Sequence, residues 1–545
     1  MESIEIVLGM LLAVVASGYL ARMLPFGVPL PLIQIALGAV ISGVFKHGTA
    51  LEPDIFFLLF LPPLLFLDGW RIPKVGLFRD KGTIIELALG LVLFTVLGIG
   101  FLMHWLIPEL PLPVAFALAA IVAPTDPVAV SSITSRIPMP PRLMHIIEGE
   151  SLLNDASGLV CFRFAVAAAM TGTFSLGQAS LTFVWLALGG IAAGVAVTYA
   201  ISRAHRFLTH RFGENDGEPV LINLLTPFGA YLAAEHIGAS GILAAVAAGI
   251  MMSYIELGGS ATATTRIRRN VVWDTLQFTL NGVMFVLLGE QLPDIFRGAL
   301  HPPGGGHPFN GWWLAGNALA LSAGLVLLRF VWVWVSLRLT ILNQRRLGQQ
   351  EYKPRLRLIL ATSFAGVRGA LTMAGVMTLP LLLPNGEPFP GRHLAILLAS
   401  SVIIVSLILA SVMLPRLLRD LEVPKEAEAE LEEDRARHAA ITAAVDAVEK
   451  AGRQHIGTPD EEVHASAYGT VVNVYRNRLR DIQTGAGEDG GADVHATRRA
   501  EREYRVTALR AERDTILRLG RRGEISDETA RKLLREIDLV EARYR

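Results

Sequence analysis

Ala123-Pro-Thr-Asp-Pro127 interrupts an apolar segment that covers about residues 113–134. Both prolines lack a backbone N–H, and Pro127 disfavours helical geometry at Asp126, so we expect a helix that breaks here. In a bilayer, irregular backbone is tolerated only where it is buried in protein or lines a cavity. The freed carbonyl near Thr125 and the carboxylate of Asp126 would then offer the hard oxygen ligands that alkali cations prefer. A plain proline kink is the alternative, and a carboxylate between two prolines makes it the weaker one.

The composition predicts that most of the chain lies in a membrane. Hydrophobic residues make up 52% of the 545 positions and charged residues only 18%, whereas soluble domains average about 25% charged residues. The charges are also segregated, because residues 421–545 hold 22 of the 49 basic and 26 of the 49 acidic residues. We therefore expect a transmembrane domain over residues 1–420 and a polar, helical cytoplasmic tail over residues 421–545.

Other features exclude several classes of protein. The single cysteine, Cys161, excludes an internal disulfide framework and a cysteine-based zinc site. The N-terminus lacks the basic region of a signal peptide and continues directly into an apolar segment. Neither a phosphate-binding GxxxxGK[ST] motif nor a dinucleotide fingerprint is present. We therefore expect no enzyme, no cofactor and no nucleic-acid partner, and an ion gradient as the source of energy.

Thirteen segments come close to the roughly 20 apolar residues that a spanning helix needs. They cover about residues 4–24, 28–45, 54–70, 83–107, 113–134, 145–171, 180–202, 219–236, 239–256, 271–291, 312–338, 356–382 and 393–418. If the N-terminus lies outside, the cytoplasmic loops hold nineteen Lys/Arg and the outside loops three, as the positive-inside rule requires. An even number of helices would destroy this alternation. The sequence therefore predicts an all-α, multi-pass protein of the cell (inner) membrane of a prokaryote, with its tail in the cytoplasm.

The tail has the pattern of helices joined by a linker. Apolar positions such as Leu534 and Ile537 recur among charged residues, and the Gly-rich acidic stretch at residues 484–491 indicates the linker. A regulatory or dimer-contacting domain fits this pattern, and so does a set of solvated helices without a specific role. The sequence does not name a cytosolic regulator.

The sixth segment contains the densest polar group, Glu148-Gly-Glu-Ser-Leu-Leu-Asn-Asp155, and ionisable groups inside a membrane are functional hypotheses by default. Glu150 and Asn154 are four residues apart and share one helix face. Ser151 and Asp155 share the adjacent face by the same spacing, so both faces point at one locus. A proton and a cation each neutralise a buried carboxylate, so they compete for Asp155, and that competition is exchange. A simple hydrogen bond from Asp155 to a neighbouring helix explains the cluster less well.

The twelfth segment contains Phe364-Ala-Gly-Val-Arg-Gly-Ala370, in which two glycines flank a cation. We expect Arg368 to donate to Glu150 or to Asp126. The fifth and twelfth segments are seven apart in order, as they would be if segments one to six recurred as eight to thirteen with inverted topology. Interrupted segments at corresponding positions of two halves point to an ion site at the membrane midplane. No repeat of individual residues accompanies this placement, so the symmetry rests on the motifs alone.

Further charged residues lie in apolar segments, and their positions along those segments indicate which of them support the site. Asp68 ends the third segment and either supports the site or is a helix-end charge. Glu235 is a second candidate for a supporting role, although its place near a helix end also allows its side chain to snorkel to the interface. Glu290 and Arg329 also lie near predicted helix ends, where snorkelling would suffice, and their roles stay open, as does that of Arg163.

Taken in order, these motifs resemble the monovalent cation:proton antiporters, in their sodium/proton exchanger branch. The resemblance covers the membrane domain and rests on Leu61-Pro-Pro-Leu-Leu-Phe-Leu-Asp-Gly69, Pro124-Thr-Asp-Pro127, Glu150-Ser-Leu-Leu-Asn-Asp155, Ser240-Gly-Ile-Leu243 and Gly366-Val-Arg-Gly-Ala370. It implies an inverted-repeat antiporter fold of about 13 transmembrane helices, with interrupted helices that cross at the midplane. It also implies a homodimer, in which a core domain moves against a dimerisation domain to give alternating access.

The resemblance assigns roles to residues by position. It implies that Na+, or K+, and protons share one site built from Asp155, Asp126, Ser151 and Thr125. Glu150 would pair with Arg368. Asn154 beside Asp155 goes with electroneutral one-for-one exchange in that family, where a second acid at this position goes with electrogenic exchange.

The leading hypothesis is therefore a Na+/H+ antiporter. A K+/H+ antiporter with the same mechanism is the alternative, because the ligands do not fix the size of the cavity. A passive cation channel would need a charged ring or a repeated filter motif, and the sequence contains neither. A receptor that signals through the tail would leave the buried polar cluster without a function.

Overall fold

The computed structural model describes residues 2–24, 28–45, 53–72, 74, 81–134, 139–171, 176–213, 217–257, 263–300, 311–346, 356–383, 386–419, 427–454, 461–485, 491–522, 524 and 527–542. Over these residues the protein is nearly all helical, and its one β-bridge joins Leu382 and Pro388. The chain divides into two compact units, Met1–Val423 and Pro424–Arg545.

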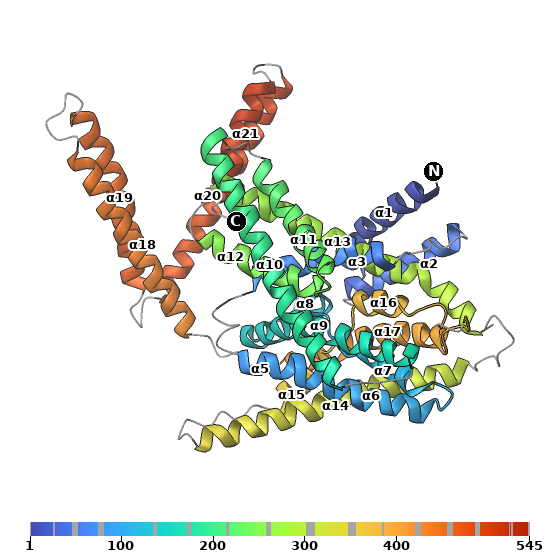
Figure 1. Cartoon of the computed structure of the whole chain (residues 1–545). Helices are drawn as coiled ribbons and strands as arrows, with labels where there is room; N and C mark the ends of the chain where they lie inside the picture. The colour runs from blue at the N-terminus through green and yellow to red at the C-terminus, as the bar shows by residue number, and fades with distance from the viewer. Residues whose placement is uncertain are drawn as a thin grey trace. The chain divides into compact units, whose positions relative to one another are not determined.

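The first unit contains the apolar helices (Figure 1). They are α1 (Glu2–Met23), α2 (Leu30–Phe45), α3 (Pro53–Arg71), α5 (Lys81–Ile85), the π-helical η1 (Glu86–Leu91), α6 (Val92–Leu106), α7 (Leu112–Val122), α8 (Pro127–Thr134), α9 (Pro141–Thr171), α10 (Leu176–Phe212), α11 (Glu218–His236), α12 (Gly241–Leu257), α13 (Ala263–Leu300), α14 (Gly311–Arg346), α15 (Leu356–Phe364), α16 (Ala370–Met377) and α17 (Arg392–Leu418).

Each of the thirteen predicted segments overlaps a helix or a series of adjoining helices. In the described part of the chain, seven helices are long and apolar enough to cross a membrane, and the bent pair α7 and α8 makes an eighth if it counts as one span. Shorter apolar helices, such as α12, accompany them. The protein is therefore a multi-pass membrane protein, and the count of thirteen spans with an inverted repeat stays a prediction.

The helices of the first unit pack as two bundles, because contacts are dense within each set and sparser between them. Bundle A consists of α1, α2, α3, α10, α11, α12 and α13, and bundle B of α5, η1, α6, α7, α8, α9, α14, α15, α16 and α17. Within bundle A, α3 and α12 approach so closely that a Cβ at Gly69 would lie 2.5 Å from the carbonyl oxygen of Val246. Small residues at such crossings let membrane helices pack backbone against backbone.

The second unit contains α18 (Ala427–Arg453), α19 (Glu461–Gly485), α20 (Gly491–Arg521) and α21 (Asp527–Ala542). Helix α18 packs on α19 and α20 packs on α21, so the unit holds two helical hairpins. One ion pair lies within each hairpin. Arg476 is 3.2 Å from Glu449 in the first, and Arg513 is 2.6 Å from Asp538 in the second. Most of the predicted Gly-rich linker, residues 486–490, lies outside the described residues.

Candidate ion-binding site

Two interrupted helices of bundle B meet at their breaks. The first break separates α7 from α8, which bend by 42° relative to each other, and the second separates α15 from α16. The backbone N–H of Asp126 in the first break donates to the carbonyl of Val367 in the second, at 2.7 Å. A Cβ at Gly369 would lie 2.6 Å from Cγ of Asp126, so only glycine leaves room for this approach. The two motifs singled out in the sequence therefore form one junction.

The Asp126 carboxylate begins α8 as a helix cap. Its Oδ1 accepts a hydrogen bond from the backbone N–H of Val128 at 2.8 Å. The first N–H groups of a helix have no partner inside the helix, and an acidic side chain at that end satisfies one of them. Pro127 occupies the first helical position, where its missing N–H costs nothing. The sequence Asp-Pro thus positions a carboxylate at the start of a short helix.

The backbone carbonyls freed by the two breaks are satisfied by buried arginines. Nε of Arg368 donates to the carbonyl of Val122 at 2.8 Å, and its NH1 donates to the carbonyl of Gly366. Nε of Arg329 donates to the carbonyl of Thr362 at 2.9 Å. These carbonyls lie at or beside the C-terminal ends of α7 and α15, where a positive charge is favourable.

Glu150 pairs with Arg329, and this corrects the predicted partner. The guanidinium holds the carboxylate at 2.6 and 2.7 Å, and both residues are at most 2% exposed. The expected pairing of Glu150 with Arg368 is wrong, because Nε and NH1 of Arg368 donate to carbonyls on the two breaks instead. The sequence left the role of Arg329 open beside a predicted helix end, and α14 runs on to Arg346 and leaves it far inside the helix.

Thr125 connects the first break to α9. Its carbonyl accepts a hydrogen bond from Oγ of Ser151 at 3.0 Å, and its Oγ1 accepts one from Nδ2 of Asn154 at 3.0 Å. Its hydroxyl in turn donates to Oε1 of Glu150 at 3.4 Å. Both predicted polar faces of α9 are therefore in use: Glu150 and Asn154 hold Thr125 in place, while Ser151 and Asp155 line a cavity.

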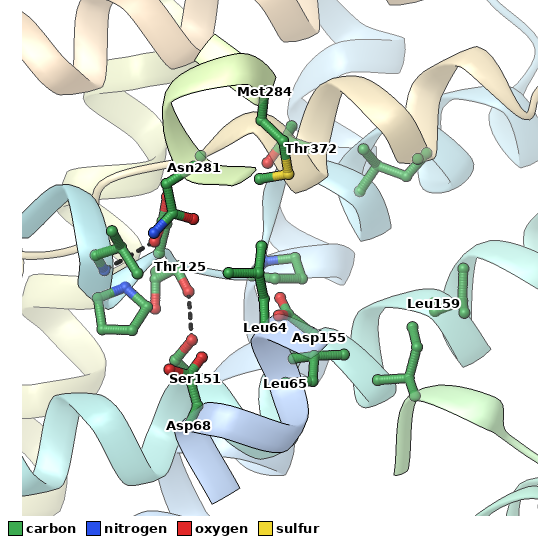
Figure 2. A pocket seen from close by; sticks show the side chains of 18 of the residues that line it. Leu64, Leu65, Asp68, Thr125, Ser151, Asp155, Leu159, Asn281, Met284 and Thr372 are labelled. Carbon is green, nitrogen blue, oxygen red and sulfur yellow. Dashed lines mark hydrogen bonds between the residues drawn. The ribbon is translucent and has the colours of Figure 1, made fainter. Parts of the chain in front are cut away.

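This site cavity has a volume of about 80 Å³ and lies between the two bundles. Its polar wall contains Asp68, Thr125, Asp126, Ser151, Asp155, Asn281 and Thr372 (Figure 2). Neither Asp68 nor Asp155 forms a hydrogen bond or a close ion pair with any residue that the structure describes. The volume is sufficient for a partly dehydrated monovalent cation. Within the described ranges, no three His, Cys, Asp or Glu side chains form a metal-holding group, so hydroxyl, carbonyl or water oxygens would have to complete a coordination shell.

The predicted site residues divide into three groups in the structure. The site cavity is lined by the four predicted ion ligands, Thr125, Asp126, Ser151 and Asp155. Asp68, a predicted supporting residue, lines it as well. Behind the cavity wall lie Glu150, Asn154 and Arg368, with exposed fractions of 0–2%. Glu235 lies elsewhere: its Oε1 accepts from the N–H of Gly241 at 3.3 Å and is 3.8 Å from NH2 of Arg163.

Apart from Asp68, sequence reasoning missed the polar and apolar residues that bundle A contributes to the cavity and the uncharged ones on α16. Asn281 and Met284 on α13 and Thr372 on α16 line the site cavity, and Figure 2 shows all three around it. An ionisable group stands out in an apolar segment, whereas a neutral amide gives a weaker signal. The amide of Asn281 between Leu280 and Gly282 was the available clue.

A second cavity, the vestibule, adjoins the site cavity and has a volume of about 260 Å³. Asp68 and Ser151 line both spaces, and the vestibule extends from them to Glu148, Arg71 and Gln277. NH1 of Arg71 donates to Oε1 of Gln277 at 2.9 Å, and its NH2 is 2.5 Å from Asp274. The site is thus adjoined by a larger polar space at the Glu148 end of α9.

An interrupted-helix junction beside unpaired carboxylates in a membrane protein is the architecture of an ion-coupled secondary transporter. A family model described as "Sodium/hydrogen exchanger, transmembrane" matches residues 9–420, and the chain belongs to that family. It is a transporter family rather than an enzyme family.

Individual relatives agree with this membership. The chain is 41% identical to an uncharacterised Na+/H+ exchanger of Escherichia coli, YjcE, over 99% of each chain. It is 38% identical to the sodium, potassium, lithium and rubidium/H+ antiporter of Bacillus subtilis, over 100% of this chain and 78% of the relative. The solved sodium proton antiporter MjNhaP1 from Methanocaldococcus jannaschii matches with a TM-score of 0.56 and 20% identity, over 77% of this chain and 99% of that one. The last comparison shows a shared fold.

Proposed function

We propose that the protein exchanges Na+ for H+ across the cell membrane at the site cavity. The observation that carries this proposal is a set of three carboxylates, Asp68, Asp126 and Asp155, around one cavity that no cationic side chain of the described residues lines. A charge buried in a membrane protein needs a counter-charge. An arriving cation or proton supplies it, and each can do so only when the other has left.

Asp155 is the proposed shared group. A cation would be held by Asp155 and Asp126, together with the oxygens of Ser151 and Thr125. Protonation of Asp155 removes the charge that attracts the cation, so binding of one ion releases the other. The neutral Asn154 contributes no further acid, which supports electroneutral exchange of one cation for one proton.

Movement between the two bundles is the proposed route of alternating access. The site cavity is lined by both bundles, and their mutual contacts are sparser than those inside each. A rocking of bundle B against bundle A would therefore expose the cavity to each side in turn. We propose an inverted-repeat fold of thirteen helices and a homodimer, with the N-terminus outside and a regulatory tail, residues 421–545, in the cytoplasm.

Potassium is a second candidate substrate. The Bacillus subtilis relative is named for sodium, potassium, lithium and rubidium, which favours a broad choice of monovalent cations here as well. A cavity lined by carboxylates and hydroxyls on separate helices has no rigid ring of ligands to select one ionic radius.

Purified protein in vesicles tests these proposals. With a pH gradient imposed, Na+, K+ and Li+ are added in turn, and the decay of the gradient is followed with a pH-sensitive dye. We expect Na+ to collapse the gradient with no dependence on membrane potential. No response to any of the three cations would overturn the exchanger proposal, and a voltage-driven current without proton movement would indicate a channel.

A further inference from the structure

Asn281 contributes the one side-chain amide that lines the site cavity among the described residues. It lies on α13 of bundle A, whereas Asp126 and Asp155 belong to bundle B. Figure 2 shows its amide pointing toward the part of the cavity where Thr125 lies. The side chain is half-buried and forms no hydrogen bond with a residue that the structure describes.

The amide of Asn281 has no hydrogen-bond partner among the described residues, so its oxygen is available to whatever occupies the cavity. Bundle A otherwise lines the cavity with apolar side chains, such as Ile242 and Met284, and with Asp68. The charged groups that line the cavity are Asp68, Asp126 and Asp155, and all three are acidic. The surroundings therefore favour a positively charged partner for the oxygen of the amide.

The chemistry of an amide differs from that of a carboxylate in one respect that matters for exchange. Both offer a hard oxygen to an alkali cation. A carboxylate also binds a proton, whereas the side-chain amide of asparagine does not titrate. An amide ligand thus strengthens cation binding and leaves proton binding unchanged.

We infer that Asn281 is a cation ligand supplied by bundle A, and that it biases the competition at Asp155 toward the cation. The inference rests on the proposed function of the same cavity. It has a mechanical consequence: a bound cation bridges the two bundles through Asn281, whereas a proton on Asp155 is held by bundle B alone. The cation-loaded and proton-loaded forms then differ in what ties the bundles together.

The test separates cation affinity from proton affinity. We would reconstitute Asn281→Leu, which has nearly the same volume but no oxygen, and measure the KM for Na+, the maximal rate and the pH dependence of exchange. Loss of one neutral ligand predicts a KM raised roughly fivefold, the effect of one hydrogen-bond-strength contact. The maximal rate and the pH at half-maximal rate, measured at a saturating Na+ concentration, should stay as in the wild type.

Matched variants keep the result interpretable. Thr279→Val removes a side-chain oxygen from the same helix outside the site cavity, where the hydroxyl of Thr279 donates to the carbonyl of Thr275 at 2.8 Å, so its KM should equal that of the wild type. Asn281→Asp restores an oxygen ligand but adds an acid, so its KM should recover while its pH profile shifts. If Asn281→Leu fails to accumulate, Asn281→Ala, which also lacks a side-chain oxygen, provides the same comparison.

Two outcomes would overturn the inference. An unchanged KM in Asn281→Leu would show that the amide does not touch the cation. A shift of the pH profile together with KM would show instead that Asn281 donates a hydrogen bond to a carboxylate and acts on proton binding. Failure of the proposed function is distinguishable from both, because the wild type would then show no cation-dependent exchange.

Discussion

The carboxylate of Glu150 and the carboxylates of the site cavity lie in the same membrane domain but differ in whether a cationic side chain pairs with them. Glu150 is closed off by two short hydrogen bonds from Arg329, and the exposed fractions of the two residues are 1% and 2%. Asp68 and Asp155 have no such partner in the described part of the chain and face a cavity. Burial alone therefore does not identify a carboxylate that binds the transported ion. A paired charge holds the junction of broken helices together, and an unpaired one is available to an ion.

Replacing Asp155 by Asn should have the largest effect on exchange. The variant removes the group for which cation and proton compete, so the rate should fall below detection in the vesicle assay. Because Asp155 has no hydrogen-bond or ion-pair partner among the described residues, thermal unfolding in detergent should stay close to that of the wild type. Retained exchange in a well-folded Asp155→Asn variant would place the ion site elsewhere.

Replacing Glu150 by Gln should mainly affect stability. The change leaves Arg329 as an uncompensated buried cation, which costs about 3–5 kcal/mol in proteins where it has been measured. We expect a fall in melting temperature of roughly 10 °C. The double variant Glu150→Gln/Arg329→Met removes both charges and should recover part of that loss. A stable Glu150→Gln variant that has lost exchange would show that the Glu150–Arg329 pair takes part in transport. The pair would then not differ in role from the unpaired carboxylates of the cavity.

Replacing Gly369 by Ala should disturb the junction itself. The new Cβ would lie 2.6 Å from Cγ of Asp126, so the capping carboxylate must move. We expect exchange to fall by about tenfold, the effect of displacing one reacting group by an ångström or less. Gly375→Ala on the same helix is the control, because its Cβ would meet only the side chain of Ile121 at 3.4 Å or more. Equal behaviour of the two variants would contradict the close crossing.

Replacing Glu148 by Gln should have the smallest effect. Glu148 lines the vestibule rather than the site cavity, so its charge acts on arriving cations at a distance. We expect the KM for Na+ to rise about twofold at low ionic strength and to approach the wild-type value at high ionic strength set with a non-transported salt. Glu148→Asp keeps the charge and should match the wild type. A lower maximal rate would mean that Glu148 belongs with the unpaired carboxylates of the site.

The interrupted helices and one wall of the site were predictable from local sequence. Prolines on both sides of Asp126 and glycines on both sides of Arg368 disrupt helices by their own stereochemistry, wherever those helices lie. The spacing of Ser151 and Asp155 places them on one face of α9 before any packing is known. These features depend only on neighbours along the chain.

The partners of the buried charges were not predictable in the same way. Arg329 and Arg368 both lie among apolar residues, and only the three-dimensional packing decides which of them reaches Glu150 and which reaches the carbonyls. Asn281 was missed for a related reason, since nothing within α13 indicates that its amide lines a cavity shared with another bundle. Glu235 was predicted to support the site because it is a charged residue in an apolar segment, yet it lies near Arg163.

The hydrogen bond between Asp126 and Val367 joins main chain to main chain, and this bears on how the protein tolerates variation. Its donor and acceptor are present in every amino acid except proline at the donor position, so natural drift in the side chain of residue 367 would leave the link intact. We expect a saturation mutagenesis library to accept other apolar residues of similar volume at this buried position and to reject side chains at Gly369. The junction would then depend on backbone geometry, and evolution would preserve it mainly by keeping residue 369 a glycine rather than by keeping a particular side chain at residue 367.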